Sequence, residues 1–317
     1  MTAGTSQLGI GLAAVARPAY ITSGRAADLG AHRDVDDLRV RTEAVLDAAY
    51  AAGIRYVDVA RSYGRAEEFL AGWLRRHPEI DDVEIGSKWG YRYVGGWRVD
   101  ASVHEVKDHS LAAFDEQVAE TGALLGPRLG IYHIHSATPE TGALEDTALH
   151  RALAGLRERG VRVGVSTSGP AQADTVRRAL EIQVDGAPLF TSFQSTWNVL
   201  EPSVGAALSE AAGTGARVIV KEAVANGRLT PGAPDAPPAA AALAAEVGLP
   251  LDQLAIAAAL AQPWAWRVLS GAVDPLQVTS NAAAAAVVLP PAVVPALGAL
   301  AEEPRAYWSA RSARRWS

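Results

Sequence analysis

Short runs of β-branched and other apolar residues recur along the whole chain, separated by stretches with helical periodicity. Such alternation is typical of parallel sheets, in which each strand returns through a helix. The runs occupy residues 8–11, 55–60, 83–88, 129–135, 161–167, 189–194, 217–221 and 266–271. Eight strand and helix units predict an α/β fold, a single-domain (β/α)8 TIM barrel over residues 1–317.

The stretches between the runs carry their own boundary signals. Residues 37–52 are followed by Gly53 and residues 103–125 by Gly126, and a glycine of this kind commonly ends a helix. We therefore predict helices over both stretches. A Pro/Ala tract at residues 231–242 is the nearest candidate for a linker, and we expect it to form a surface loop and not a domain boundary.

Composition excludes several classes of protein. The 317 residues include no cysteine, so disulfides, thiolate nucleophiles and cysteine-ligated zinc are excluded. A net charge of -6 argues against nucleic acid or an anionic membrane as the main partner. The first residues lack a basic start and a long apolar core, so we expect no secretory signal and a cytoplasmic protein. Residues 282–301 carry no charge, but consecutive alanines and three prolines predict a surface helix and a loop there, not a membrane span.

Two short motifs have weak functional interpretations. Gly9 to Ala14 spells G-x-G-x-x-A, but Arg17-Pro18 follows too soon for the helix that a dinucleotide-binding Rossmann unit requires. We interpret these glycines as a tight strand end. His133 and His135 lie two apart on one strand and therefore on one face, which is half of a metal site. No later strand end supplies further ligands, so we predict no metal site and keep a metal-dependent hydrolase as a remote alternative.

Three polar residues at neighbouring strand ends form the most informative pattern. Asp58 alternates with apolar residues on its strand and is expected inside the barrel, where a carboxylate requires a partner. Lys88 ends the next strand and can supply that partner, and Tyr63 follows five residues after Asp58. A lysine ammonium beside a phenol favours the phenolate, which suits acid and base chemistry. A structural ion pair beneath a surface tyrosine explains the same spacing.

With these residues in place, nearly the whole chain resembles the aldo-keto reductase superfamily. The block from Asp58 to Gly64 with Glu67 resembles the family's D-x-A-x-x-Y-G-x-x-E motif. The resemblance implies a barrel that binds NAD(P)H across its C-terminal rim and reduces an aldehyde or ketone, or oxidises the corresponding alcohol. It implies that Tyr63 is the general acid, that Lys88 lowers its pKa and that Asp58 holds Lys88. His135 would then orient the carbonyl, with His133 as a neighbour only.

The resemblance also implies a set of cofactor contacts. These are Ser166 and Thr167, Gln194, Lys221, and the segment containing Gly271, Ala272, Gln277 and Asn281. It favours NADP(H), but residues 272–281 carry no lysine or arginine and Ser280 stands where the family commonly has glutamate, so NAD(H) stays possible. We expect a small-molecule carbonyl or alcohol substrate, lined by Trp89, Tyr91, Trp97 and Trp197. No oligomeric state is predicted, and a nicotinamide-binding redox sensor without turnover is the second hypothesis.

Overall fold

The computed structural model describes residues 4–24, 28–30 and 32–317. A closed parallel barrel forms its centre, with the strand order β1-β12-β11-β10-β7-β6-β3-β2. The strands are β1 (Leu8–Gly11), β2 (Tyr56–Asp58), β3 (Glu84–Trp89), β6 (Leu129–Ala137), β7 (Arg162–Thr167), β10 (Ser192–Thr196), β11 (Arg217–Lys221) and β12 (Arg267–Ser270). The predicted (β/α)8 barrel is therefore confirmed, because each of the eight apolar runs contributes one barrel strand.

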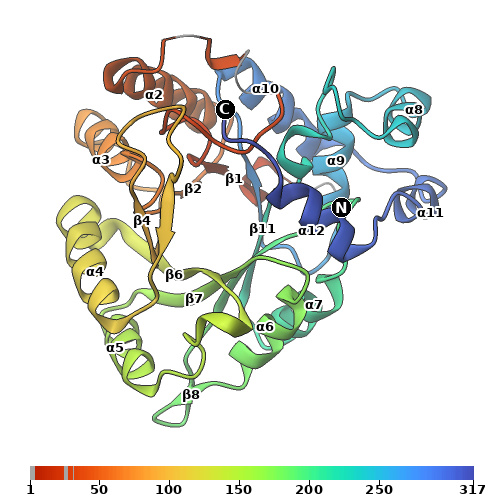
Figure 1. Ribbon diagram of the computed structural model, residues 1–317. Helices are drawn as coiled ribbons and strands as arrows, with labels where there is room; N and C mark the ends of the chain where they lie inside the picture. The colour runs from red at the N-terminus through yellow and green to blue at the C-terminus, as the bar shows by residue number, and fades with distance from the viewer. Residues whose placement is uncertain (1–3, 25–27, 31) are drawn as a thin grey trace.

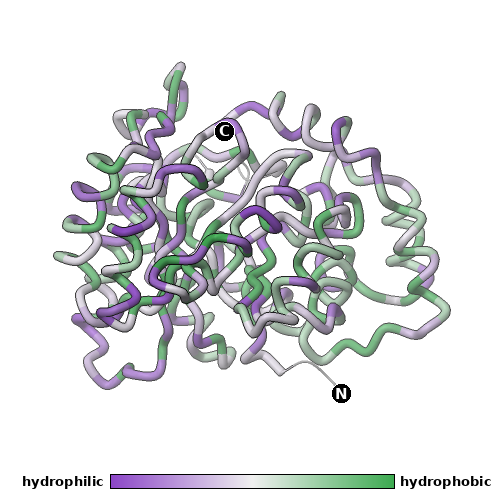
Figure 2. Tube along the Cα trace, turned by 90° about the horizontal axis from the view of Figure 1, so that it is seen from below, coloured by the Kyte–Doolittle hydropathy of each residue, from purple (hydrophilic) through white to green (hydrophobic). Residues whose placement is uncertain are grey.

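Helices surround this barrel, as the end-on view shows (Figure 1). They are α2 (Val35–Ala51), α3 (Ala66–Arg76), α4 (Leu111–Leu125), α5 (Thr147–Glu158), α6 (Gln172–Leu180), α7 (Gly205–Gly213), α8 (Pro238–Glu246), α9 (Leu251–Leu260), α10 (Pro275–Ala283), α11 (Val293–Gly298) and α12 (Pro304–Ser312). Seen from below, the outer helices alternate between hydrophobic and hydrophilic positions (Figure 2). This alternation is what buries one stripe of each helix against the barrel.

The barrel interior is filled by side chains from alternate strand positions. Tyr56, Ile131, Ile219 and Leu269 form an apolar cluster there, separate from the core between strands and helices. Glycine makes room for the bulkiest of the inward-facing groups. A Cβ at Gly86 would lie 2.1 Å from the Tyr56 hydroxyl oxygen, so no larger residue fits without moving that ring.

One predicted helix begins later than expected. The stretch 103–125 was expected to be helical throughout, but α4 starts at Leu111, with Ser110 as its N-cap. Residues 105–107 instead form β5 (Glu105–Lys107), which pairs antiparallel with β4 (Tyr91–Tyr93). A second hairpin joins β8 (Gln183–Val184) to β9 (Ala187–Pro188). The apolar and charged residues before Leu111 have no fixed period, so the sequence could not separate a hairpin from a first helical turn.

The end of the chain packs on its own barrel. Helix α12 buries Tyr307 and Trp308, and the segment after it crosses the rim until the Ser317 nitrogen donates to the Tyr20 oxygen at 3.1 Å. Residues 282–301 form the end of α10, a 3-10 turn, a loop and α11. Within the described ranges no single helix is long and apolar enough to cross a membrane, and only the pair α8 and α9, bent by 85°, passes that test together.

Candidate active site

A buried ion pair lies inside the barrel near the C-terminal ends of β2 and β3. The Lys88 ammonium contacts Asp58 Oδ1 and also donates to the Val59 carbonyl oxygen at 2.9 Å. Gln194 on β10 holds the other carboxylate oxygen, donating from Nε2 to Asp58 Oδ2 at 2.7 Å. Both charges are almost completely buried. The carboxylate therefore has a donor on each oxygen, as a charge in a low-dielectric interior requires.

Tyr63 stands above this pair on the loop after β2. Its backbone nitrogen donates to the Ala60 oxygen at 3.1 Å, and Gly64 follows with a φ of +60°. A Cβ on Gly64 would lie 2.6 Å from the Ala16 oxygen, so glycine lets this loop pack against the loop after β1. The Lys88 ammonium lies 4.7 Å from the centre of the Tyr63 ring. The Tyr63 ring therefore packs directly on the Lys88–Asp58 ion pair.

His135 completes the group from the end of β6. Its Nε2 lies 3.5 Å from the Tyr63 hydroxyl oxygen, and the two rings meet edge to face at 5.4 Å. The register of β6 against β7 shifts between Ile134 and Ala137, and Ser136 takes a φ of +52°. A bulge of this kind redirects a side chain at a strand end. Here it leaves His135 facing Tyr63.

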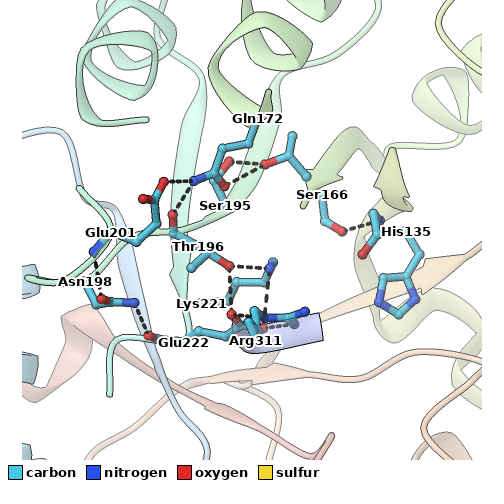
Figure 3. A network of polar contacts seen from close by, with 12 residues as sticks. His135, Ser166, Gln172, Ser195, Thr196, Asn198, Glu201, Lys221, Glu222 and Arg311 are labelled. Carbon is cyan, nitrogen blue, oxygen red and sulfur yellow. Dashed lines mark hydrogen bonds and ion pairs between the residues drawn. The ribbon is translucent and has the colours of Figure 1, made fainter. Parts of the chain in front are cut away.

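Side chains from neighbouring elements hold this bulge in place. His109 Nε2 bonds to the His135 oxygen at 2.9 Å, and Lys107 Nζ donates to the Ser136 oxygen at 2.9 Å. The Ser136 nitrogen donates to Ser166 Oγ at 2.8 Å, which Figure 3 shows beside His135. The orientation of His135 thus depends on the β5 segment as well as on its own strand.

The protonation states follow from burial and from the nearby charges. Burial and the Asp58 carboxylate raise the pKa of Tyr63 well above its ordinary value, and the Arg17 guanidinium opposes them. Burial, together with Lys88 and Arg17, lowers the pKa of His135 well below 6.5. At neutral pH the phenol is therefore protonated and the imidazole is neutral. Burial is the largest of these effects on Tyr63, and the role of Lys88 in lowering its pKa stays a prediction.

Two adjacent cavities lie beside this group and along the rim of the barrel. A cavity of about 100 Å³ lies beside Asp58, Tyr63, Gln194 and Lys221. A larger one of about 510 Å³ continues over β12 and α10. Both are lined by Thr22, Val224, Gly227 and Gly271, so the two cavities adjoin at these residues. An elongated cleft of this form suits an extended dinucleotide with one end beside Tyr63.

Most of the predicted cofactor contacts line this cleft. Gln194, Lys221 and Gly271 line the smaller cavity, and Gly271, Ala272, Gln277 and Asn281 line the larger one. The Gln194 carbonyl oxygen Oε1 is buried and has no partner within the described structure. An unpaired acceptor at this position fits the amide of a nicotinamide, which would donate to it. The described residues thus fit the dinucleotide that the sequence implies.

Ser166 and Thr167 line neither cavity. The Ser166 hydroxyl is used by the bulge at Ser136. The Thr167 hydroxyl lies 2.7 Å from Ser195 Oγ and 3.4 Å from Oε1 of Gln172, the first residue of α6. Alternation along β7 turns successive side chains to opposite faces, so only one of this pair can face the barrel interior.

Lys221 belongs to a charged cluster at the end of β11 (Figure 3). Its ammonium donates to Thr196 Oγ1 at 2.6 Å and lies 3.7 Å from Glu222 Oε1. Burial lowers the pKa of Lys221 to about 8, against the attraction of Glu222. Arg311 from α12 donates to Glu222 Oε2 at 2.9 Å. The end of the chain therefore helps to fix the charge beside the smaller cavity.

Of the four aromatic residues predicted to contact substrate, only Tyr91 lies at the group formed by Asp58, Tyr63, Lys88 and His135. Its ring centre is 4.9 Å from that of His135. Trp89 is fully buried against Phe114 of α4. Trp97 packs on Phe69 and Tyr93, and Trp197 packs on Trp264 beside α9. Strand alternation turns Trp89 outward, because the adjacent Lys88 occupies the inward position.

His133 lies one layer deeper in the barrel than His135. Its Nε2 bonds to Ser192 Oγ at 3.0 Å, and burial lowers its pKa to about 3. Both histidines face the barrel interior, as the alternation predicts. Within the described ranges, no group of three or more His, Cys, Asp or Glu side chains is placed to hold a metal ion.

Arg17 is the site residue that sequence reasoning missed. It is almost completely buried, and its guanidinium lies 4.9 Å from the ring centres of both Tyr63 and Trp316. Glu105 Oε1 accepts from its Nη1 at 2.7 Å. Arg17 was noted only because the Arg17-Pro18 pair argues against a helix. Its contacts join segments far apart in the chain, so no local pattern indicates them.

Comparison with known proteins identifies the family. The aldo/keto reductase family model matches residues 32–302, so the chain belongs to that family. Over 131 residues the chain is 34% identical to an aldo-keto reductase from Mycobacterium sp. (strain JLS), which covers 41% of this chain and 42% of that protein. It is 42% identical over 55 residues to aldo-keto reductase str7 from Strobilurus tenacellus, 17% of this chain and 16% of that protein. The chain thus aligns with less than half of either relative.

Solved structures agree with the barrel fold. Aldo-keto reductase AKR11C1 from Bacillus halodurans superposes with a TM-score of 0.68 at 21% identity, over 95% of this chain and 96% of that one. A glycerol dehydrogenase, AKR11B4, from Gluconobacter oxydans gives a TM-score of 0.68 at 21% identity, over 93% and 90%. At this identity the likeness shows the fold alone.

Proposed function

We propose that this protein is an NAD(P)H-dependent oxidoreductase that interconverts a small aldehyde or ketone and its alcohol. The observation that carries the proposal is the contact between Tyr63 and His135 above the buried Lys88–Asp58 pair. Membership of the aldo/keto reductase family supports it. A bound nicotinamide supplies the hydride, or accepts it in the reverse direction.

Tyr63 holds the proton that a reduced carbonyl requires. Its raised pKa keeps the phenol protonated at neutral pH, so it can donate to the oxygen as negative charge develops there. Nε2 of the neutral His135 imidazole lies beside the Tyr63 hydroxyl and can donate a hydrogen bond to the same substrate oxygen. The Arg17 guanidinium lies 4.9 Å from the centre of the phenol ring and lowers the pKa of Tyr63 against burial, which limits the cost of forming the phenolate.

The substrate side is an open hollow next to Tyr91. Residues 99–105 and the end of the chain, Arg315 and Trp316, line this hollow of about 540 Å³ together with Tyr91. Polar and aromatic groups both line it. It suits a small polar carbonyl compound more than a long alkyl chain.

The experiment compares wild type with Tyr63→Phe on a panel of aldehydes, ketones and sugars, following loss of the reduced-nicotinamide absorbance. A general acid contributes about 10²- to 10⁴-fold, so we expect turnover to fall by at least about 10²-fold. Cofactor affinity, measured by quenching of tryptophan fluorescence, should stay within about twofold because the phenol hydroxyl is not a binding group. Near wild-type turnover in Tyr63→Phe would contradict the assignment. Binding without turnover on every substrate would instead favour a redox sensor.

A further inference from the structure

The larger cavity is placed to receive the adenosine half of the dinucleotide. It adjoins the smaller cavity beside Tyr63 at Gly271, so a nicotinamide bound in the smaller cavity leaves the other half of the molecule at the larger one. Helix α10 supplies Gln277, Ser280 and Asn281 to the wall of this space, and helix α9 supplies Asp252. The polar groups on this wall determine which adenosine can bind.

Asp252 lines this cavity and has one acceptor oxygen without a partner among the described residues. Its side chain lies in the first turn of α9 and the residue is only 7% exposed. Ser280 Oγ donates to Asp252 Oδ2 at 2.8 Å, and Gln253 Nε2 donates in turn to Ser280 Oγ at 3.3 Å. The other oxygen, Oδ1, is buried and has no partner within the described structure. A buried carboxylate oxygen without a donor is costly, so this one is suited to a donor on a ligand.

The charged residues described in the lining of the cavity are both acidic. None of the described residues that line it is a lysine or arginine. Its other charged member, Asp28, accepts from Gln277 Nε2 at 3.0 Å. A 2'-phosphate brings about two further negative charges at neutral pH and usually requires an arginine or lysine. Adenosine with free ribose hydroxyls instead offers donors to a carboxylate.

We propose that Asp252 is a specificity-determining residue that makes this site select NAD(H) over NADP(H). Its free Oδ1 accepts a hydrogen bond from the adenosine half, and its charge repels a 2'-phosphate. The inference rests on the proposed function, because it requires that a nicotinamide dinucleotide fills the cleft. It overrides the preference for NADP(H) that the family resemblance implies.

The test measures binding, so it does not depend on turnover. NADH and NADPH are titrated into wild type and into Asp252→Asn, with dissociation constants obtained by calorimetry or tryptophan quenching. We expect wild type to bind NADH at least about tenfold more tightly than NADPH. Asp252→Asn should reduce that ratio by about tenfold, because the amide removes the charge and keeps the shape. Asp252→Ser, with circular dichroism as a check of folding, should change the ratio in the same direction.

A matched control is Asp174→Asn. Asp174 also lies in the first turn of a helix, α6, but it is exposed and lines neither cavity, so the ratio should not change. Nicotinamide hypoxanthine dinucleotide lacks the adenine amine. Weaker binding of this analogue in wild type but not in Asp252→Asn identifies that amine as the donor, and equal binding identifies the ribose.

Two results would overturn the proposal. One is wild type binding NADPH as tightly as NADH, and the other is an unchanged ratio in both Asp252 variants. If neither dinucleotide binds wild type at all, the proposed function fails and the inference fails with it. If both dinucleotides bind, Tyr63→Phe abolishes turnover and the ratio of NADH to NADPH affinity is the same in wild type and in the Asp252 variants, only the inference fails.

Discussion

The two ends of the cleft differ in how their charged groups are satisfied. One end of the cleft contains Tyr63, and we call it the catalytic end after its proposed role. There Asp58 has donors from Lys88 and Gln194, and Arg17 is paired with Glu105. At the far end, the buried carboxylate of Asp252 has one oxygen without a partner among the residues that the structure describes. The catalytic end therefore sets its charges with internal bonds, whereas the far end leaves an acceptor for whatever binds.

This difference separates two tasks. Groups that stabilise charge during a reaction are most effective when the fold fixes them in advance, because no reorganisation is then needed. A group that discriminates between ligands works by being satisfied by one and left unsatisfied by another. We expect substitutions at the catalytic end to lower turnover and those at the far end to change cofactor choice.

The largest effect is expected for Lys88→Met. Removing one member of a buried ion pair leaves Asp58 unpaired and costs about 3–5 kcal/mol of unfolding free energy. Turnover should fall by at least about 10²-fold, since Tyr63 loses the cation that lies 4.7 Å from its ring centre. Urea unfolding and steady-state kinetics measure the two effects.

The double variant Lys88→Met with Asp58→Leu separates them. Replacing both charges with apolar groups should restore much of the stability but none of the turnover. A double variant that recovers turnover would show that the ion pair is only structural, and the contrast between the two ends would then fail.

A smaller effect is expected for Arg17→Met. The Arg17 guanidinium opposes the rise in the pKa of Tyr63, so its removal should raise that pKa further. A cation over a desolvated ring contributes up to about 2 kcal/mol, so we expect alcohol oxidation at neutral pH to slow by about tenfold. The pH at which oxidation accelerates should also move upward. Arg17→Lys keeps the charge and should restore the pH profile, which a purely structural role for Arg17 would not predict.

The ion pairs of Glu222 should make the stability of the protein depend on pH in acid. Burial alone would raise the pKa of Glu222, but Arg311 and Lys221 lower it from an ordinary value of 4.5 to about 2. Between these two values the unfolded chain binds a proton that the folded protein does not, so unfolding free energy falls as pH falls from 4.5 toward 2. The stability advantage of wild type over Glu222→Gln should be full above pH 4.5 and shrink across that window. Urea unfolding across this range measures it, and a constant difference would contradict the pairing.

The predicted barrel is confirmed, and the four residues predicted to be catalytic lie together in it, for physical reasons. Strand alternation places Asp58 and His135 inside, and consecutive parallel strands bring Asp58 and Lys88 to one rim. Prediction from the sequence failed for contacts between segments that are far apart in the chain. Arg17 meets Trp316 across almost the whole chain, and Asp252 meets Ser280 across two helices. The β4 and β5 hairpin was missed because its short strands carry no clear period.

The smallest effect is expected for Asp28→Asn at the far end, which compares two carboxylates in one cavity. Asp28 is exposed, and its Oδ2 already has a donor in Gln277, so its charge is screened by solvent and salt. We expect the ratio of NADH to NADPH affinity to change by less than about threefold, and the change to vanish at high ionic strength. The effect of Asp252→Asn should persist in salt, because that carboxylate is buried. Equal, salt-sensitive effects of both substitutions would show that the cavity selects by net charge alone and that the unpaired oxygen of Asp252 has no special role.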